Sequence, residues 1–287
     1  MRRREKFGEF YRALGEYLRE NPQTDNSVSL FGYGSYFDHP DKDPKDIDGG
    51  IVMPTLITDK EVVRGISKEI AKLSKGLEIH RGQIQINLLD RVSAGDGRFL
   101  SYSPDYTEFL RRHGKRLVSR PNFLEFNGID NKFNVYESNA FNFRKARNYL
   151  LMANVAMQEG ESSVMTHFSK IIDVVKRAPK KTLQLGLIRK LIETQPWPNI
   201  GLEIANLVAT IGKEDAVGQL GGLVGEVDLS FYNKIRRYED PEFVRGLLGN
   251  EEEIFQVWAR AVETYEGLVK GFIDNNPPME IKVKTII

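Results

Sequence analysis

The chain has 287 residues, 40% of them hydrophobic and 28% charged, and this is the composition of a folded globular protein rather than a disordered or fibrous one. Its 41 Lys and Arg residues against 40 Asp and Glu residues leave a net charge of +1. No overall charge excess therefore draws the molecule to nucleic acid or to anionic lipid. The absence of cysteine excludes disulfides, thiolate nucleophiles and cysteine-based metal sites, and it is consistent with a reducing compartment.

Targeting and membrane segments are not expected. The basic start, Arg2-Arg3-Arg4, is not followed by the apolar run of roughly 7–15 residues that a signal peptide contains. No segment approaches the run of about 18 apolar residues that spans a bilayer. We interpret these three arginines as a mobile terminus and expect a cytoplasmic protein without a membrane partner.

The first half of the chain alternates short apolar runs with turn-forming residues. Helical spacing of apolar residues and short apolar runs predict helices at residues 4–20 and 60–75 and strands at residues 27–32, 49–53 and 83–89. Helices beside a few strands predict an α/β (α+β) domain with a small mixed sheet. We place this domain at residues 1–137, with a hairpin of residues 123–126 and 133–136 near its end.

From residue 138 to residue 287 the apolar spacing is helical, which predicts a mostly α-helical bundle domain. The expected helices are residues 140–158, 163–176, 182–194, 200–211, 242–248 and 251–275. His167 falls among apolar residues of one of these helices and is expected to be a packed histidine. Arg144 and Arg147 lie one turn apart near the start of the helical domain, where they form either a solvated face or a contact to phosphate.

The residues that carry chemistry are Gly34-Ser35, ten intervening residues, and then Asp46-Ile47-Asp48. The strand period of two places Asp46 and Asp48 on one face, where both carboxylates can bind one Mg²⁺. Gly34 allows the backbone to approach a phosphate, and the Ser35 hydroxyl can donate to phosphate oxygens. This combination predicts a magnesium-dependent site for a polyphosphate substrate.

The arrangement over residues 4–92 resembles the signature of the polymerase-β-type nucleotidyltransferase superfamily, a Gly-Ser turn followed after a short loop by an Asp-apolar-Asp pair. The resemblance implies a minimal α/β core with a trailing helical domain that closes the other wall of the cleft. It also implies transfer of a nucleoside monophosphate from a nucleoside triphosphate such as ATP to an acceptor hydroxyl, with Mg²⁺ held by Asp46 and Asp48. Gly34 and Ser35 would then bind the nucleotide.

Two features depart from this family pattern. Gly49-Gly50 replaces the apolar residue after the second acid, which is expected to loosen the strand. The third carboxylate of the family is missing from the polar face of residues 83–89, where Gln85 and Asn87 stand. Asn87 is a nucleotide-binding candidate. Asp90 is the candidate third catalytic acid, although strict alternation places it on the opposite face unless a bulge turns it toward the site.

Three interpretations remain open. In the first, the chain transfers a nucleotide with two acids and a base borrowed from Asp90 or from the substrate. In the second, it is a silent relative that binds nucleotide or acts as a regulatory protein, for example in a toxin–antitoxin-type pair. In the third, the predicted register of the strand at residues 83–89 is shifted by one residue. The acceptor is a small molecule, a protein or an RNA end, and the near-neutral charge slightly favours the first two. The basic run at residues 111–120 is either an exposed face or an RNA contact.

Overall fold

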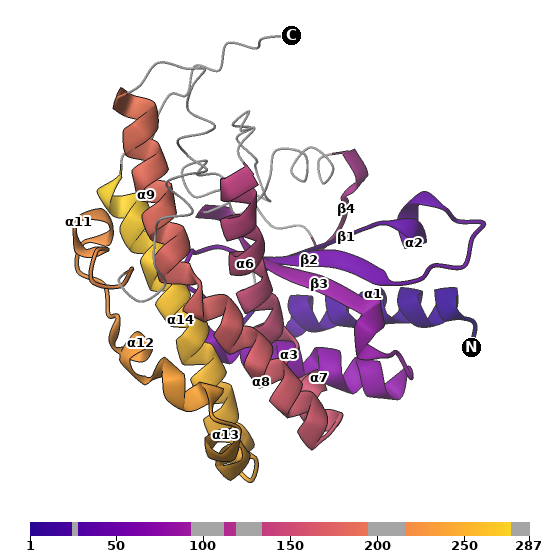
Figure 1. Cartoon of the computed structure of the whole chain (residues 1–287). Coiled ribbons are helices and arrows are strands. Elements are labelled where there is room, and N and C mark those ends of the chain that lie inside the picture. The colour runs from indigo at the N-terminus through magenta and orange to yellow at the C-terminus, as the bar shows by residue number, and fades with distance from the viewer. Residues whose placement is uncertain (25–27, 93–111, 119–133, 195–215, 277–287) are drawn as a thin grey trace.

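The computed structural model describes residues 1–24, 28–92, 112–118, 134–194 and 216–276 (Figure 1). These residues form an N-terminal mixed four-stranded sheet with helices, followed by a mostly helical C-terminal region, so the predicted fold class is confirmed. In this part of the chain no helix combines the length and the apolar character needed to cross a membrane.

The sheet has the strand order β3-β2-β1-β4. Its strands are β1 (Ser29–Tyr33), β2 (Ile47–Met53), β3 (Ile84–Asp90) and β4 (Lys115–Val118). β2 and β3 run parallel, and β1 is antiparallel to both β2 and β4. Asp48 on β2 is paired with Tyr33 on one side and with Gln85 on the other, so the three side chains form one row across the sheet. This pairing agrees with the predicted strand register.

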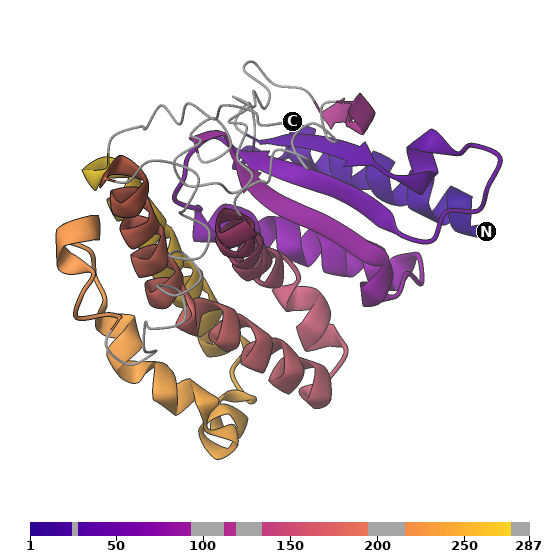
Figure 2. The ribbon, with the colours of Figure 1, turned by 45° about the horizontal axis from the view of Figure 1, so that its top comes forward.

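Two amphipathic helices, α1 (Arg3–Glu20) and α3 (Lys60–Gly76), lie on one side of the sheet (Figures 1 and 2). Their apolar faces are buried, as the helical spacing predicts. α3 begins where the side chain of Asp59 accepts hydrogen bonds from the backbone N–H groups of Glu61 and Val62. The opposite face of the strands carries the acids of the candidate site.

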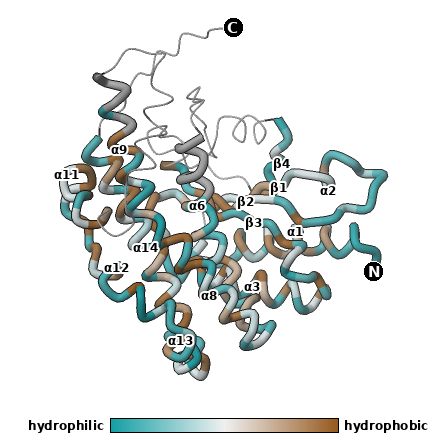
Figure 3. The backbone as a smooth tube through the Cα atoms, viewed as in Figure 1, coloured by the Kyte–Doolittle hydropathy of each residue, from teal (hydrophilic) through white to brown (hydrophobic). Residues whose placement is uncertain are grey.

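The C-terminal region consists almost entirely of helices. They are α6 (Asn134–Leu151), α7 (Ala153–Gln158), α8 (Glu161–Lys176), α9 (Ala178–Thr194), α11 (Gly221–Val224), α12 (Ser230–Lys234), the 3-10 helix η3 (Ile235–Glu239), α13 (Pro241–Leu247) and α14 (Glu251–Asn275). Asn250 caps α14, and three glutamates occupy its first turn, where negative charge complements the helix dipole. In the hydropathy view, hydrophobic and hydrophilic stretches alternate along α8 and α14, as expected for amphipathic helices (Figure 3).

Several predicted boundaries need correction. The strand expected at residues 133–136 is wrong from Asn134 onward, because α6 begins there. The helix expected at residues 140–158 is two helices, α6 and α7, separated at Met152. The strand expected at 123–126 and the helix expected at 200–211 lie outside the described residues.

A buried ionic cluster joins the sheet to the helical region. Arg147 on α6 lies at its centre: its Nη1 is 2.5 Å from Asp90 Oδ2 at the end of β3, and its Nε is 2.8 Å from Glu266 Oε1 on α14. The same guanidinium also donates to the carbonyl oxygen of Leu56. Thr58 N donates to Glu266 Oε2 at 2.8 Å. Arg147 is 1% exposed, so it neither forms a solvated face nor is available to phosphate.

The buried apolar residues of the sheet region and of the helical region form one continuous core. α6 also begins upstream of residue 138, within the predicted first domain. The division into domains at residues 1–137 and 138–287 stays a prediction.

His167 is a packed core histidine, as predicted. It is 3% exposed, its Nε2 lies 2.5 Å from the Tyr149 carbonyl oxygen, and its ring contacts the rings of Tyr149 and Trp258 edge to face. Burial lowers the pKa of His167 to about 4, because the charged imidazolium loses its hydration in the core.

Candidate functional site

The Gly34-Ser35 turn lies directly against Asp48. β1 ends at Tyr33, and Gly34 turns the chain with a φ of +80°, in the region that favours glycine. A Cβ atom at position 34 would collide with Oδ2 of the Asp48 carboxylate. Glycine is therefore required both by the backbone conformation and by the close approach of the acid.

Ser35 is the first residue of the short helix α2 (Ser35–Asp38). Its Oγ is buried and makes no hydrogen bond to any residue that the structure describes. A buried hydroxyl without a partner is uncommon in native proteins, because leaving it unsatisfied costs about 1–3 kcal/mol. The Ser35 hydroxyl is thus available to an oxygen atom of a ligand.

Asp46 and Asp48 lie together, as the strand period predicts. Asp46 immediately precedes β2, Asp48 is the second residue of the strand, and both are partly buried. Burial, then the negative charge of Asp46 and a hydrogen bond between the two carboxyl groups, raises the pKa of Asp48 to about 7. Two carboxyl groups held this close repel each other when both are ionised, and a shared cation removes that repulsion.

Amide side chains of β3 complete this face. Gln85, paired with Asp48, donates from Nε2 to Asp46 Oδ2 at 3.0 Å. Asn87 is paired with Gly50, two residues further along the strand, and its Nδ2 donates to Tyr33 Oη at 3.4 Å. Gln85 therefore orients Asp46 and adds no charge beside Asp48.

The structure does not bring Asp90 to the acid pair. β3 pairs regularly with β2 up to Met53 and Asp90, so no bulge turns the Asp90 side chain toward Asp48. Asp90 is fully buried and paired with Arg147. Within the described residues no group of three or more His, Cys, Asp or Glu side chains could hold a metal ion.

Gly49 and Gly50 do not loosen β2, contrary to the expectation from sequence. The strand pairs continuously with β1 and β3 through both residues. A Cβ atom on Gly50 would collide with the Phe31 ring and with Leu89, and a Cβ atom on Gly49 would press on the Phe31 carbonyl oxygen. The two glycines thus allow Phe31 to pack closely across the strand that carries the acids.

The loop between Ser35 and Asp46 is held by an arginine that the sequence interpretation assigned to a mobile terminus. Arg4 on α1 donates to three carbonyl oxygens of this loop, those of Tyr36 at 2.8 Å, His39 at 2.6 Å and Lys42 at 2.8 Å. Hydrogen bonds to backbone carbonyls leave no pattern of residue types in a sequence, so neither spacing nor charge identifies this contact. Arg4 is an anchor of the site, and its prediction as mobile was wrong.

Both views of the ribbon place α2 and its following loop at one end of the molecule and α9, α11 and α12 at the other (Figures 1 and 2). α9, α11 and α12 therefore do not lie beside the candidate site, whereas α6 packs against β3 of the sheet. Comparison with protein-family models, with curated proteins and with solved structures finds no match for this chain.

Proposed function

We propose that the chain is a nucleotidyltransferase that transfers a nucleoside monophosphate from a nucleoside triphosphate to an acceptor hydroxyl. The observation that carries the proposal is the close approach of Gly34 to Asp48, whose carboxyl group is hydrogen-bonded to that of Asp46. Family resemblance remains the source of the reaction type, and the site geometry supports it.

The residues present fit a magnesium ion. Mg²⁺ prefers oxygen ligands and is usually held by one or two carboxylates together with substrate phosphates and water. Asp46 and Asp48 supply such carboxylates, and Ser35 Oγ is a buried group without a partner among the described residues. When bound, the ion would neutralise charge on the phosphates and stabilise the charge that develops during transfer.

The residues of the chain have distinct roles in the proposed reaction. Asp46 and Asp48 would hold the Mg²⁺ ion, and Gln85 fixes Asp46 by its 3.0 Å hydrogen bond. Ser35 donates to a phosphate oxygen, while Gly34 lets the chain approach it. A bond forms between the acceptor oxygen and the α-phosphorus, the α–β phosphoanhydride bond breaks, and pyrophosphate leaves. The acceptor proton passes to a group of the substrate, since Asp90 is committed to Arg147.

A second candidate function is nucleotide binding without turnover, in a silent or regulatory relative. One observation favours it: the residue beside Asp48 on β3 is Gln85, and an amide cannot accept a proton at neutral pH. Both candidates use the same ligands for magnesium and triphosphate, and they differ only in the chemical step.

The acceptor class is part of the proposal. A small molecule or a protein hydroxyl is favoured over an RNA end, because a net charge of +1 offers little to neutralise a long phosphate backbone. Screening intact masses of candidate acceptors for an added nucleotide would identify it.

Pyrophosphate release separates the two candidates. The native protein and the Asp46→Asn and Asp48→Asn variants are incubated with each nucleoside triphosphate and Mg²⁺, with and without candidate acceptors. Release in the native protein that both variants abolish supports the transferase. Nucleotide binding without release supports the silent candidate, and the absence of both binding and release contradicts the proposed site.

A further inference from the structure

A single guanidinium on α1 holds the segment that separates the Gly34-Ser35 turn from the acid pair. Arg4 donates from Nη1 to the carbonyl oxygen of Tyr36 and from Nη2 to the carbonyl oxygens of His39 and Lys42. The side chain is half-buried and makes no ion pair with any acid that the structure describes. Its positive charge therefore serves backbone carbonyls rather than a carboxylate.

Two of these carbonyls lie at the end of the short helix α2, which begins with Ser35. A helix leaves its last carbonyl oxygens without partners inside the helix, and a basic side chain can satisfy them. Arg4 supplies this cap, since Tyr36 lies within α2 and His39 directly follows it. The placement of Ser35, the hydroxyl donor of the candidate site, therefore depends on a residue of α1.

The same helix also holds the strand that carries the acids. Tyr11 lies two helical turns after Arg4, and it donates from Oη to the carbonyl oxygen of Asp48 at 2.9 Å. Its ring contacts the rings of Tyr36 and Phe37, with centroids 5.3 and 5.1 Å apart. Residues seven apart lie on one face of a helix. One face of α1 thus contacts both sides of the site, α2 and the start of β2.

On the basis of the proposed function, we infer that Arg4 and Tyr11 are positioning residues of the magnesium–triphosphate site. Arg4 fixes α2, which carries Ser35, and Tyr11 fixes the backbone of Asp48. Together they set the separation between the hydroxyl and the acid pair, although they act from the side of the sheet opposite to the acids. Loss of residues that support metal ligands from behind typically lowers metal affinity or activity about 10–100-fold.

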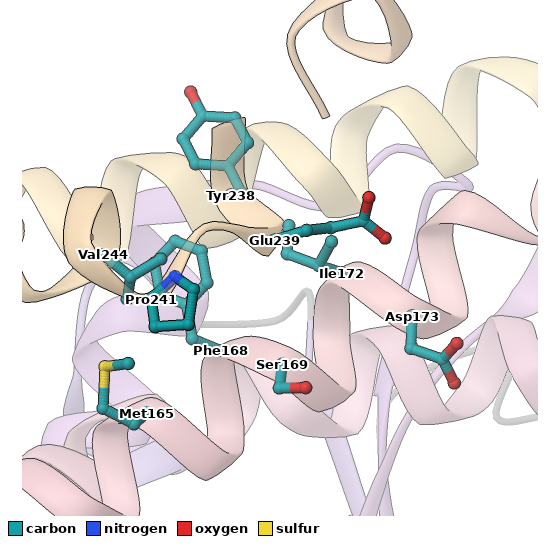
Figure 4. Close-up of a pocket in the computed structure, with 9 residues that line it drawn as sticks. All are labelled: Met165, Phe168, Ser169, Ile172, Asp173, Tyr238, Glu239, Pro241 and Val244. Atoms are coloured by element: carbon teal, nitrogen blue, oxygen red, sulfur yellow. The ribbon is translucent and has the colours of Figure 1, made fainter. Parts of the chain in front are cut away.

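The pocket in the helical region offers no second magnesium site. It has a volume of about 300 Å³ and lies between α8, η3 and α13 (Figure 4). Its two acidic lining residues, Asp173 and Glu239, are already paired with Arg177 and Lys176. An effect of Mg²⁺ on nucleotide binding therefore reports on the acid pair beside Gly34.

The test is titration calorimetry of ATP binding in Mg²⁺ and in EDTA, at a temperature at which circular dichroism shows each variant to be folded. The quantity compared is the factor by which Mg²⁺ tightens ATP binding, which a loss of global stability does not change in the folded protein. Arg4→Met is compared with Arg3→Met, which removes the same charge from an exposed neighbour whose contact is an ion pair with Asp43 at 3.8 Å. We expect Arg4→Met to lower the factor at least ~10-fold and Arg3→Met to leave it unchanged.

Two milder variants keep the test decisive if Arg4→Met does not fold. Tyr11→Phe removes one hydroxyl and should lower the factor about 3-fold or more, as the loss of a hydrogen bond does. Its control is Tyr17→Phe, which removes a hydroxyl of α1 that is bonded to Asn21 and should have no effect. Arg4→Lys keeps the charge but lacks the two separate nitrogens that reach three carbonyls, so its factor should stay below that of the native protein.

The native protein shows which of the two ideas fails. If Mg²⁺ does not tighten ATP binding by the native protein, the proposed function fails and the positioning roles fail with it. If Mg²⁺ does tighten binding, a variant that behaves like its control overturns the role of that residue while the proposed function stands. A native factor in Arg4→Lys would assign the effect to charge alone and would overturn the role of the three hydrogen bonds.

Discussion

Replacing Arg147 with methionine should destabilise the protein severely. The change keeps an unbranched side chain beside Phe143, whose ring lies 4.2 Å from the guanidinium, but it removes the cation shared by Asp90 and Glu266. Both acids are fully buried, so their carboxylates would remain in the core without a counter-charge. Breaking a buried ion pair in this way costs about 3–5 kcal/mol.

Arg64→Met is the matched control for this experiment. Arg64 on α3 also pairs with an acid of α14, Glu252, but the Glu252 side chain is 54% exposed. Water solvates that carboxylate after the substitution, so the expected loss of stability is much smaller. Urea denaturation followed by circular dichroism measures the free energy of unfolding of both variants.

The pH dependence gives a second readout. Burial already raises the pKa of Glu266, and Arg147 lowers it. In Arg147→Met the pKa of Glu266 should therefore rise further, so the folded state binds a proton more strongly than the unfolded chain. The variant should then regain part of its lost stability as the pH falls below 7, relative to the native protein. If Arg147→Met costs no more than Arg64→Met at pH 7, our account of the buried ionic cluster is refuted.

Three further predictions concern the site and the core. Gly34→Ala should abolish magnesium-dependent nucleotide binding and lower the free energy of unfolding, measured with heat or urea, by about 1–2 kcal/mol. The reason is that alanine is strained at this backbone conformation and its Cβ meets Asp48. Nucleotide binding like that of the native protein would contradict this. Gln85→Glu should increase the stabilisation by Mg²⁺ in a thermal-shift assay, since it adds a carboxylate beside Asp48, and an unchanged shift would count against a metal site on this face. His167 takes up a proton near pH 6.5 in the unfolded chain but only near pH 4 in the folded protein. The contribution of neutral His167 to stability is therefore complete above pH 6.5 and falls by about 3 kcal/mol as the pH drops to 4. A His167→Gln variant whose stability has the same pH profile as that of the native protein would contradict this.

Local periodicity predicted much of the fold. The spacing of apolar residues identified α1, α3 and α14, and short apolar runs identified β1, β2 and β3. Strand alternation also placed Asp46, Asp48 and the β3 amides on one face, since side-chain direction in a strand depends only on register. β4 was missed because its first residues, Lys115 and Arg116, are charged and exposed, so the strand has no apolar alternation.

Contacts between distant segments could not be predicted in this way. Asp90 is held by Arg147, 57 residues further along the chain, and no spacing rule connects them. Arg4 reaches the loop after α2 through backbone carbonyls, which every residue possesses. The glycines at positions 49 and 50 suggest flexibility in isolation, and only the packing of Phe31 explains them.

The most direct test of the proposed site is the affinity for ATP with and without Mg²⁺. Calorimetry of the native protein in Mg²⁺ and in EDTA isolates the contribution of the cation. We predict that Mg²⁺ tightens ATP binding by the native protein and that Asp46→Asn/Asp48→Asn removes the effect. ATP affinity that is the same with Mg²⁺ and with EDTA, or that survives the loss of both carboxylates, would contradict a shared-cation triphosphate site.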